Sequence, residues 1–477
     1  MSSNVNELKY SGSEPPGPQY TGWQAAIASY FKFDEYKTNF RTEIVAGITT
    51  FMTMAYILVV NPLILSDAIF LSQRRDLFPE LVFATAISAA IGTIVMALIA
   101  KYPFALAPGM GLNAFFAYSV VVGLGINWRI ALAAVLVEGL IFIALTITDI
   151  RRHLITAIPT TIKVATTIGI GLFIAYIGLA GDVETGGAGL IVADQATKTS
   201  FGSFRQPNTL IATAGLLITS AFMLRRVKGG LLWGIFATAL LGWILGVTPW
   251  PRGIAQIPAF PTDLFGQAIA GLAGVNLGNL LDFVAVVLVF LFVDIFDTIG
   301  TISGVGMQAG YINERGELPR ANQALLADAV ATTTGAVMGT STVTTYIESA
   351  AGVAEGGRSG FTAVIVAALF TVAIVFTPIF EAIPAYATTP ALVITGVLMM
   401  GNAASIRWGD LAEAIPAFLT IIFMPLAASI AAGLSVGMVT YPLLKSFQGK
   451  ADEIPLATWI LAGIFLARFV FMTLRFG

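Results

Sequence analysis

Fourteen stretches of mostly apolar residues follow one another along the chain. A single helix needs roughly 20 apolar residues to cross a bilayer. By that rule we predict spans over 42–66, 80–100, 104–122, 129–149, 157–179, 209–224, 229–247, 280–306, 321–338, 342–356, 360–380, 383–402, 411–447 and 455–475. Only 11% of the residues are charged, whereas a soluble domain carries roughly 25%. The sequence therefore predicts an all-α polytopic membrane protein.

Two of these stretches have unusual lengths. The stretch 342–356 is short and rich in Ser, Thr and Gly. The stretch 411–447 is too long for one span and contains Pro425, so it is expected to be one interrupted span or two short helices. The predicted number of spans is therefore fourteen, or fifteen if 411–447 crosses twice.

Basic residues gather on one side of the predicted spans, thirteen against six. Loops rich in Lys and Arg face the cytoplasm. We therefore expect a multi-pass protein of the cell membrane whose N-terminal segment, 1–40, is cytoplasmic. Two longer polar loops, about 180–208 and 248–279, would then face outward.

The composition excludes several other classes of protein. A net charge of −2 argues against a nucleic-acid partner. The chain has no cysteine, which excludes disulfides and thiolate metal sites. Its one histidine, His153, lies in a predicted loop, so a catalytic triad or a multi-histidine metal site is not expected. We predict no cofactor, no metal and no enzymatic activity; intramembrane aspartyl chemistry is the one enzymatic alternative left.

Weak internal similarity divides the chain into two halves. AIPTTIKVATTIGIGLFI begins at Ala157 and AIPAYATTPALVITGVLM at Ala382, an offset of 225 residues. Seven spans precede residue 250 and seven follow it, and an odd number per half gives the halves opposite orientations. We predict a first inverted repeat over 41–250, an extracytoplasmic linker over 251–279 and a second inverted repeat over 280–477. Paired interrupted segments in two such halves indicate the central site of a transporter.

The third and tenth spans are the interrupted segments. LAPGMGLNAFFAY contains Pro108 and Gly109, and GTSTVTTYIESAAG follows the ninth span. Each is predicted to run extended and to start its helix at mid-membrane, where unpaired N–H groups are left at the helix N-terminus. Irregular backbone at this depth is tolerated only where it lines a cavity or is buried in protein.

Acidic residues lie in the same part of the membrane. Asp294 and Asp297, in LVFLFVDIFDTIGTISG, share one face of the eighth span, and Glu348 lies in the tenth. Each acid costs roughly 2.5–3.5 kcal/mol at a helix centre, so it indicates a functional site. With Asn113, these acids form a predicted hydrogen-bonding site for a planar ring. A helix–helix hydrogen bond is the alternative for Asn113.

Other intramembrane polar residues are interpreted as structural. Glu138 and Asp328 are expected to form hydrogen bonds, with a proton relay as the alternative. Lys163 is expected to extend its ammonium group to the membrane surface. Four aromatic residues are candidates to stack on a flat ligand, although lipid or core packing is their commoner role: Phe115, Phe116, Phe296 and Tyr346.

Several stretches resemble one transporter family. They are FRTEIVAGITTFMTMAYILVVNP, APGMGLNAFFAY, FVDIFDTIGTISGV, LPRANQALLADAVATTTGAVMGTSTVTTYIESAAGVAEGGRSG and FLTIIFMPLAASIAAGLSVG. From about residue 32 onward the chain resembles the AzgA-like hypoxanthine/adenine/guanine permeases, a branch of the xanthine/uracil permease (nucleobase–ascorbate transporter) superfamily. This resemblance implies a seven-plus-seven inverted repeat with core and gate domains, and proton-coupled uptake of purines, often by a homodimer.

The resemblance also implies roles for individual residues. It implies substrate contacts at Asn113, Asp294 and Glu348, supported by Gly111 and Asp297. Asp294 would contact the ligand, and Asp297 would brace the site or carry the proton. Independently of the resemblance, a carboxylate near apolar walls can bind a proton, so Glu348 and Asp297 are the predicted proton-coupling residues. A uracil or xanthine permease is one alternative. Another is an anion transporter of related inverted-repeat fold, which would favour basic or neutral groups where Glu348 lies.

Overall fold

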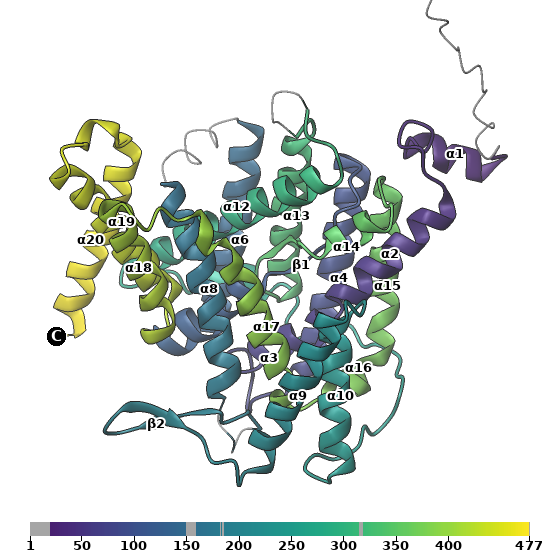
Figure 1. The fold of residues 1–477 in the computed structure, drawn as a ribbon, viewed down its shortest axis with the longest axis horizontal. Helices are drawn as coiled ribbons and strands as arrows, with labels where there is room; N and C mark the ends of the chain where they lie inside the picture. Colours follow the sequence, from purple (N-terminus) through teal and green to yellow (C-terminus); the bar gives the residue numbers. More distant parts are fainter. Residues whose placement is uncertain (1–19, 149–158, 182, 184–185, 314–317, 477) are drawn as a thin grey trace, which may run out of the picture.

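The structure, a computed structural model, is a helical bundle (Figure 1) that describes residues 20–148, 159–181, 183, 186–313 and 318–476. For 468–476 only the backbone is described. His153 and residues 1–19 of the predicted N-terminal segment lie outside the described residues. So do three of the basic residues used for the predicted orientation, namely Arg151, Arg152 and Arg315.

The first half of the chain contains seven successive units. They are α2–α3 (Phe40–Met54, Ile57–Leu65), α4 with the π-helix η1 (Phe78–Val95, Met96–Ala100), β1 with α5 and the π-helix η2 (Leu106–Pro108, Met110–Ala114, Phe115–Gly123), α6 (Trp128–Ile147), α8 (Thr160–Ala180), α9 (Pro207–Leu224) and α10 (Gly230–Ile244).

The second half repeats this order. Its units are α12 (Leu280–Gln308), α13 (Ala321–Met338), β4 with α14 (Val343–Thr345, Ser349–Ala354), α15–α16 with η3 between them (Gly360–Ala373, Ile374–Phe376, Thr377–Glu381), α17 with η5 (Thr389–Met400, Gly401–Ser405), α18 (Leu411–Leu426) and α19 (Ile430–Phe447). In both halves the third unit is a short strand followed by a helix. The predicted seven-plus-seven inverted repeat, with extended segments in spans three and ten, is confirmed.

A few elements lie outside these units. They are α1 (Trp23–Tyr30), the hairpin β2–β3 (Ile191–Asp194, Lys198–Phe201), α11 (Gln267–Leu272), η4 (Ala385–Ala387), η6 (Ala451–Glu453) and α20 (Leu456–Phe476). The stretch 411–447 forms two helices, α18 and α19, which pack on each other. The chain leaves the helical conformation at 427–429, just after Pro425. The helix α20 therefore follows the fourteenth unit.

The two interrupted units pair through a short antiparallel ribbon at the centre of the bundle (Figure 1). Leu106 is opposite Thr345 and Pro108 is opposite Val343. Proline disfavours helix at the preceding residue, and β-branched residues favour extended backbone. The strands β1 and β4 are fully buried. Each strand therefore supplies hydrogen-bond partners that neither water nor lipid would provide at this depth.

Side chains from neighbouring helices satisfy the remaining edges of this ribbon. The backbone N–H of Leu106 donates to Thr93 Oγ1 on α4 at 2.9 Å. Thr332 Oγ1 on α13 donates to the carbonyl of Val343 at 2.9 Å. The backbone N–H of Thr345 donates to Asp328 Oδ1 at 2.8 Å. Asp328 therefore has the structural role that the sequence indicated, because it holds β4 against α13.

The helices form two packed groups, which correspond to the predicted core and gate domains. The core domain includes α2, α4, α6, α12, α13 and α15, which pack on one another around β1 and β4. The gate domain includes α8, α9, α10, α17, α18 and α19. The helix α8 is the gate helix that contacts both α5 and α12 of the core domain.

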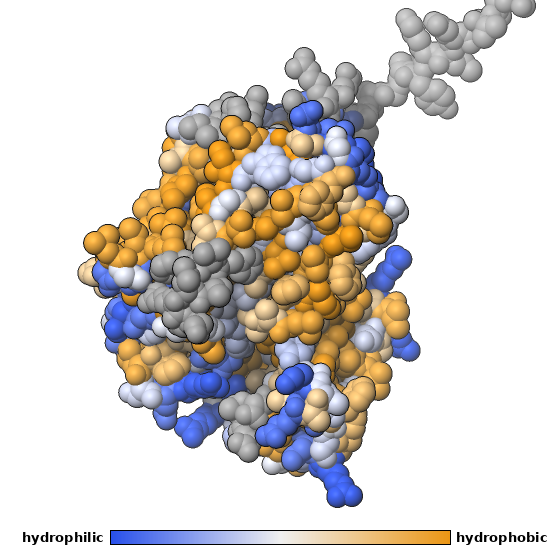
Figure 2. Space-filling view, turned by 90° about the vertical axis from the view of Figure 1, so that its left-hand side faces the viewer, coloured by the Kyte–Doolittle hydropathy of each residue, from blue (hydrophilic) through white to orange (hydrophobic). Residues whose placement is uncertain are grey.

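The outer surface of the bundle suits a bilayer. Figure 2 shows apolar side chains over much of the middle of one face, with hydrophilic side chains mainly toward its edges. Among the described residues, eight helices are long and apolar enough to span a membrane, and four shorter apolar helices accompany them. The predicted polytopic architecture is therefore confirmed.

The close contact between α4 and α13 gives a prediction about stability. A Cβ atom on Gly92 would lie 2.5 Å from Ala331 Cβ on α13 and 3.5 Å from Leu106 Cβ on β1. Gly92→Ala should therefore destabilise the protein by about 1–3 kcal/mol through overpacking, offset by about 1 kcal/mol of helix propensity. The measurement is the melting temperature of the purified protein in detergent.

A matched control is Gly300→Ala on α12, where an added Cβ would have nothing within 4 Å. This control should melt at or above the wild-type temperature. Equal melting temperatures for the two variants would contradict the close packing of α4 on α13 and β1.

Candidate functional site

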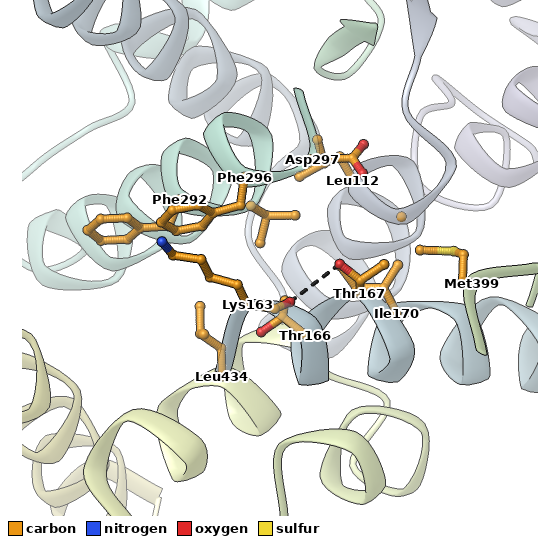
Figure 3. A pocket seen from close by; sticks show the side chains of 12 residues that line it. Leu112, Lys163, Thr166, Thr167, Ile170, Phe292, Phe296, Asp297, Met399 and Leu434 are labelled. Atoms are coloured by element: carbon orange, nitrogen blue, oxygen red, sulfur yellow. Dashed lines mark hydrogen bonds between the residues drawn. The ribbon is translucent and has the colours of Figure 1, made fainter. Parts of the chain in front are cut away.

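A cavity lies where the gate helix α8 faces α5 and α12 of the core domain (Figure 3). Its volume is about 40 Å³, which holds about three water molecules. Its lining residues come from both domains: Gly111, Leu112, Lys163, Thr166, Thr167, Ile170, Phe292, Val293, Phe296, Asp297, Met399 and Leu434. Because this cavity lies between the core and gate domains at the interrupted span three, it is the candidate substrate site.

Asp297 is the one carboxylate on the lining of this cavity, and Lys163 is its one cationic group. The Lys163 Nζ atom lies 4.7 Å from the centre of the Phe296 ring, in a cation–π contact. In Figure 3 the Lys163 amine is directed at the phenylalanine rings, while Asp297 approaches from the opposite side. Lys163 therefore lines the cavity, and the prediction that it extends to the membrane surface is wrong.

Gly111 allows the close contact between α5 and α8. A Cβ atom at this position would lie 2.4 Å from Ile170 Cγ2 on α8. Carbon atoms in ordinary contact stay about 3.5–4.0 Å apart. Any side chain on Gly111 would therefore push the core and gate domains apart beside the cavity.

Glu348 is partly exposed and lies near Asp297, but it is not among the residues that line this cavity. Tyr56 Oη donates a 2.7 Å hydrogen bond to Glu348 Oε1. Tyr56 lies in the break between α2 and α3, within FMTMAYILVVNP, and the sequence analysis did not identify it as part of the site. Glu348 itself is the residue just before α14, so the interrupted tenth span determines its position.

Asn113 joins the two interrupted units. Its side chain is fully buried, and its Oδ1 atom accepts a hydrogen bond from Ser341 Oγ on the segment that leads into β4. Its Nδ2 atom is 3.5 Å from the carbonyl oxygen of Pro108. In this arrangement Asn113 bonds to the non-helical segment before β4, and it does not lie on the cavity lining.

Asp294 lies on the side of α12 that faces α13 and α6. It is fully buried, and its Oδ2 atom accepts a 3.3 Å hydrogen bond from Thr332 Oγ1 on α13. Only Asp297, three residues further along α12, reaches the cavity. The structure therefore brings Gly111 and Asp297 to the cavity, with Glu348 beside them and Asn113 and Asp294 behind.

Among the aromatic candidates, Phe296 lines the cavity. Its ring lies parallel to that of Phe292, at an interplanar angle of 7° and a centroid distance of 6.4 Å. Phe115 instead packs on Phe290 at a centroid distance of 4.9 Å. Tyr346 donates a 2.5 Å hydrogen bond to the carbonyl of Pro108. Phe296 is therefore the aromatic residue best placed to contact a flat ligand.

A second, larger cavity of about 600 Å³ lies further along α8, toward its C-terminal end. Tyr118 Oη donates to Asp67 Oδ2 at 2.8 Å on its wall, and the Arg74 guanidinium is 3.7 Å from Asp67 Oδ1. One face of α8 lines both cavities, with residues spaced by one, three or four positions: Lys163, Thr166, Thr167, Ile170, Phe173, Tyr176 and Ile177. This face of α8 was not predicted from the sequence, although one lysine and paired threonines in an apolar span could have indicated it.

Comparisons with known proteins identify the family. The xanthine/uracil permease model, described as a permease family, matches residues 41–436. The guanine/hypoxanthine permease PbuG of Bacillus subtilis (strain 168) is 44% identical over 456 residues, which cover 94% of this chain and 100% of PbuG. The adenine permease AdeP of Escherichia coli (strain K12) is 38% identical over 458 residues, which cover 95% of this chain and 98% of AdeP.

Solved structures of transporters share the fold. The transmembrane domain of the cyanobacterial bicarbonate transporter BicA matches with a TM-score of 0.57 at 17% identity, covering 83% of this chain and 97% of that domain. The murine anion transporter Slc26a9 in its inward-facing state matches with a TM-score of 0.56 at 10% identity, covering 94% and 77%. With its sequence motifs, its repeated architecture and these relatives, the chain belongs to the xanthine/uracil permease family, in the hypoxanthine/adenine/guanine permease branch.

Proposed function

We propose that this permease takes up purine nucleobases by proton symport through alternating access. The observation that carries the proposal is the cavity between α8 and α12, where Asp297 and Lys163 lie on opposite sides with Phe296 between them. The names of PbuG and AdeP, a guanine/hypoxanthine and an adenine permease, support a purine as the substrate.

The polar groups at this cavity complement the edge of a purine. A purine carries ring N–H donors together with ring-nitrogen acceptors and, in guanine and hypoxanthine, a carbonyl acceptor. Asp297 accepts hydrogen bonds from ring N–H groups. Glu348 accepts further N–H bonds from the purine once the ligand displaces the Tyr56 hydroxyl. The Lys163 ammonium donates to the opposite edge, and Phe296 packs on the ring. Ionised carboxylates accept charge-assisted bonds, which are about twice as strong as neutral ones.

The two cavities along α8 support alternating access. The cavity at Asp297 is contracted to about 40 Å³, while the cavity beyond Ile170 has about 600 Å³. A purine entering from the larger cavity has to move α8 away from α5 to reach Asp297. Rocking of the gate domain against the core domain, around a site near the bilayer midplane, is the usual motion in transporters built from repeats.

An anion transporter is the second candidate, because BicA and Slc26a9 share the fold. Asp297 on the cavity lining and Glu348 beside it would repel an anion. These carboxylates favour a neutral substrate that donates hydrogen bonds, such as a nucleobase. Within the nucleobase permeases, uracil and xanthine remain the alternatives to adenine, guanine and hypoxanthine. We place the protein in the cell membrane with a cytoplasmic N-terminus, and a homodimer is the proposed assembly.

Transport assays in proteoliposomes test this function. Radiolabelled hypoxanthine, guanine and adenine should enter saturably, and acid outside should accelerate their uptake. A protonophore should abolish the acceleration, and sodium should have no effect. Uptake that requires sodium and ignores the protonophore would contradict proton symport, and uptake of uracil or bicarbonate without any purine would contradict the substrate.

A second prediction concerns Glu348. Glu348→Gln keeps the shape of the side chain but removes the charge, so charge-assisted hydrogen bonds to the ligand are lost. Such bonds are worth about 1.5–3 kcal/mol, so the Kd for purine should rise on the order of 10- to 100-fold and uptake should fall accordingly. The matched control is Glu355→Gln, because Glu355 lies after α14 and pairs with Lys228 at 2.6 Å, away from the cavity. Normal saturable uptake by the Glu348 variant would remove Glu348 from the site.

A third prediction separates the two aspartates of α12. Asp297 lines the cavity and Asp294 is buried against α13, so this packing favours Asp297 as the direct contact, the reverse of the roles implied by family resemblance. Asp297→Asn should abolish purine binding to the purified protein. Asp294→Asn should leave binding measurable and change how transport depends on pH. Loss of binding in the Asp294 variant alone would contradict this assignment and support Asp294 as the direct contact, as the resemblance implied.

A further inference from the structure

Two carboxyl groups behind the cavity have oxygen atoms without a hydrogen-bond donor among the described residues. Glu138 on α6 and Asp294 on α12 are both 0% exposed. Neither carboxylate oxygen of Glu138 has a donor among the described residues, and Asp294 Oδ1 has none either. A buried carboxylate without donors keeps its full desolvation cost, several kcal/mol for an ionised group. Three such oxygens in one place call for a physical explanation.

The explanation is that these two groups face each other. The helices α6 and α12 pack on each other, and the side chains of Glu138 and Asp294 interact there. An ionised carboxylate only accepts hydrogen bonds, so two of them in contact leave both without a donor, whereas a protonated carboxyl donates one O–H. We infer that Glu138 and Asp294 hold one proton between them, and that this pair is a proton-binding site of the permease distinct from the substrate contacts.

The neighbouring Asp328 differs from this pair, because both of its carboxylate oxygens accept hydrogen bonds. Its Oδ1 atom accepts from both the backbone N–H and the hydroxyl of Thr345 at 2.8 Å, and its Oδ2 atom accepts from Thr298 Oγ1 at 2.8 Å. Three donors stabilise its ionised form. The oxygens of Glu138 and Oδ1 of Asp294 have no such donors among the described residues, so a proton is better placed on the Glu138–Asp294 pair than on Asp328.

No cation takes the place of that proton among the residues described. The charged groups that act on the pair are Asp328 on α13 and Asp297 on α12, both acidic. Within the described ranges, no lysine or arginine forms an ion pair with Glu138 or Asp294. The same residues contain no group of three or more His, Cys, Asp or Glu side chains arranged to hold a metal ion. The geometry favours a proton over sodium.

Tight packing holds α6, and Glu138 with it, against α13. A Cβ atom on Gly139, next to Glu138, would lie 2.6 Å from Thr333 Oγ1 and 2.9 Å from the Thr333 backbone nitrogen on α13. The helix α6 is therefore pressed on α13, and Asp294 is tied to the same helix by Thr332. Loss of the proton would leave two like charges in contact within this rigid group of helices.

One member of the pair, Asp294, lies on a helix that lines the substrate site, and this links the pair to transport if the proposed proton symport holds. Asp297 lies one turn beyond Asp294 on α12, on the cavity lining. When the O–H bond of the pair breaks and the proton passes to water, the two carboxylates repel each other. Because α6 is held against α13, this repulsion acts on α12. A shift of α12 changes the position of Asp297. The pair is therefore the positioning element through which the proton controls the substrate site.

Infrared spectroscopy of the purified permease without substrate tests the proton itself. At neutral pH the wild-type protein should show the carbonyl band of a buried protonated carboxyl group, shifted in D₂O. Glu138→Gln should lose this component, because the glutamine amide donates to Asp294 and no shared proton is needed. Asp294→Asn is the second variant and should lose the same component. The control Glu80→Gln, whose carboxylate accepts backbone N–H bonds at 3.1 Å near the surface, should retain it.

Transport by the same variants tests the coupling. In proteoliposomes Glu138→Gln should retain exchange of labelled for unlabelled purine and lose accumulation driven by a pH gradient. An unchanged carboxyl band in both the Glu138 and Asp294 variants, or full pH-driven accumulation by Glu138→Gln, would overturn the inference. Absence of purine exchange in the wild type would contradict the proposed function instead, and the infrared result would still decide whether the pair holds a proton.

Discussion

The antiparallel pairing of β1 with β4 is the interaction on which the rest of this structure depends. Each strand interrupts a membrane-spanning unit, and neither could stay extended at membrane depth without the other. Their register, with Ala107 opposite Thr344, fixes where α5 and α14 begin. Because one strand comes from each half of the chain, the pairing also locks the two inverted repeats together at the point where the candidate site lies.

The helices around this ribbon carry polar residues because its backbone needs hydrogen-bond partners at membrane depth. Thr93, Thr332 and Asp328 form hydrogen bonds with backbone groups of β1 or β4. Asp328 is thus retained in an apolar helix by three donors rather than by a ligand. Intramembrane acids in this permease therefore fall into two kinds: those saturated by donors from the fold, and those, such as Glu138, whose oxygens find none.

The sequence predicted the fold well where the signal was local. The extended segments at Pro108 and at the Thr-rich stretch before Glu348, and the break after Pro425, follow from backbone chemistry that a single sequence reveals. The division of roles along α12 did not follow, because Asp294 and Asp297 share one face by spacing, and only packing against α6 and α13 shows which one reaches the cavity. The prediction for the Lys163 side chain failed for the same reason, because the sequence does not show which helices pack around that residue.

The fold shared with BicA and Slc26a9 raises the question of how one architecture suits both anions and a neutral base. In this chain the third and tenth units meet at the same ribbon, but the groups next to their helices are carboxylates, Glu348 and Asp297. An acid at this location rejects anions and accepts N–H donors, and it also provides a group that can bind a proton. Under the proposed function, the carboxylates next to the ribbon select a neutral substrate, and the separate Glu138–Asp294 pair behind them binds the coupling proton.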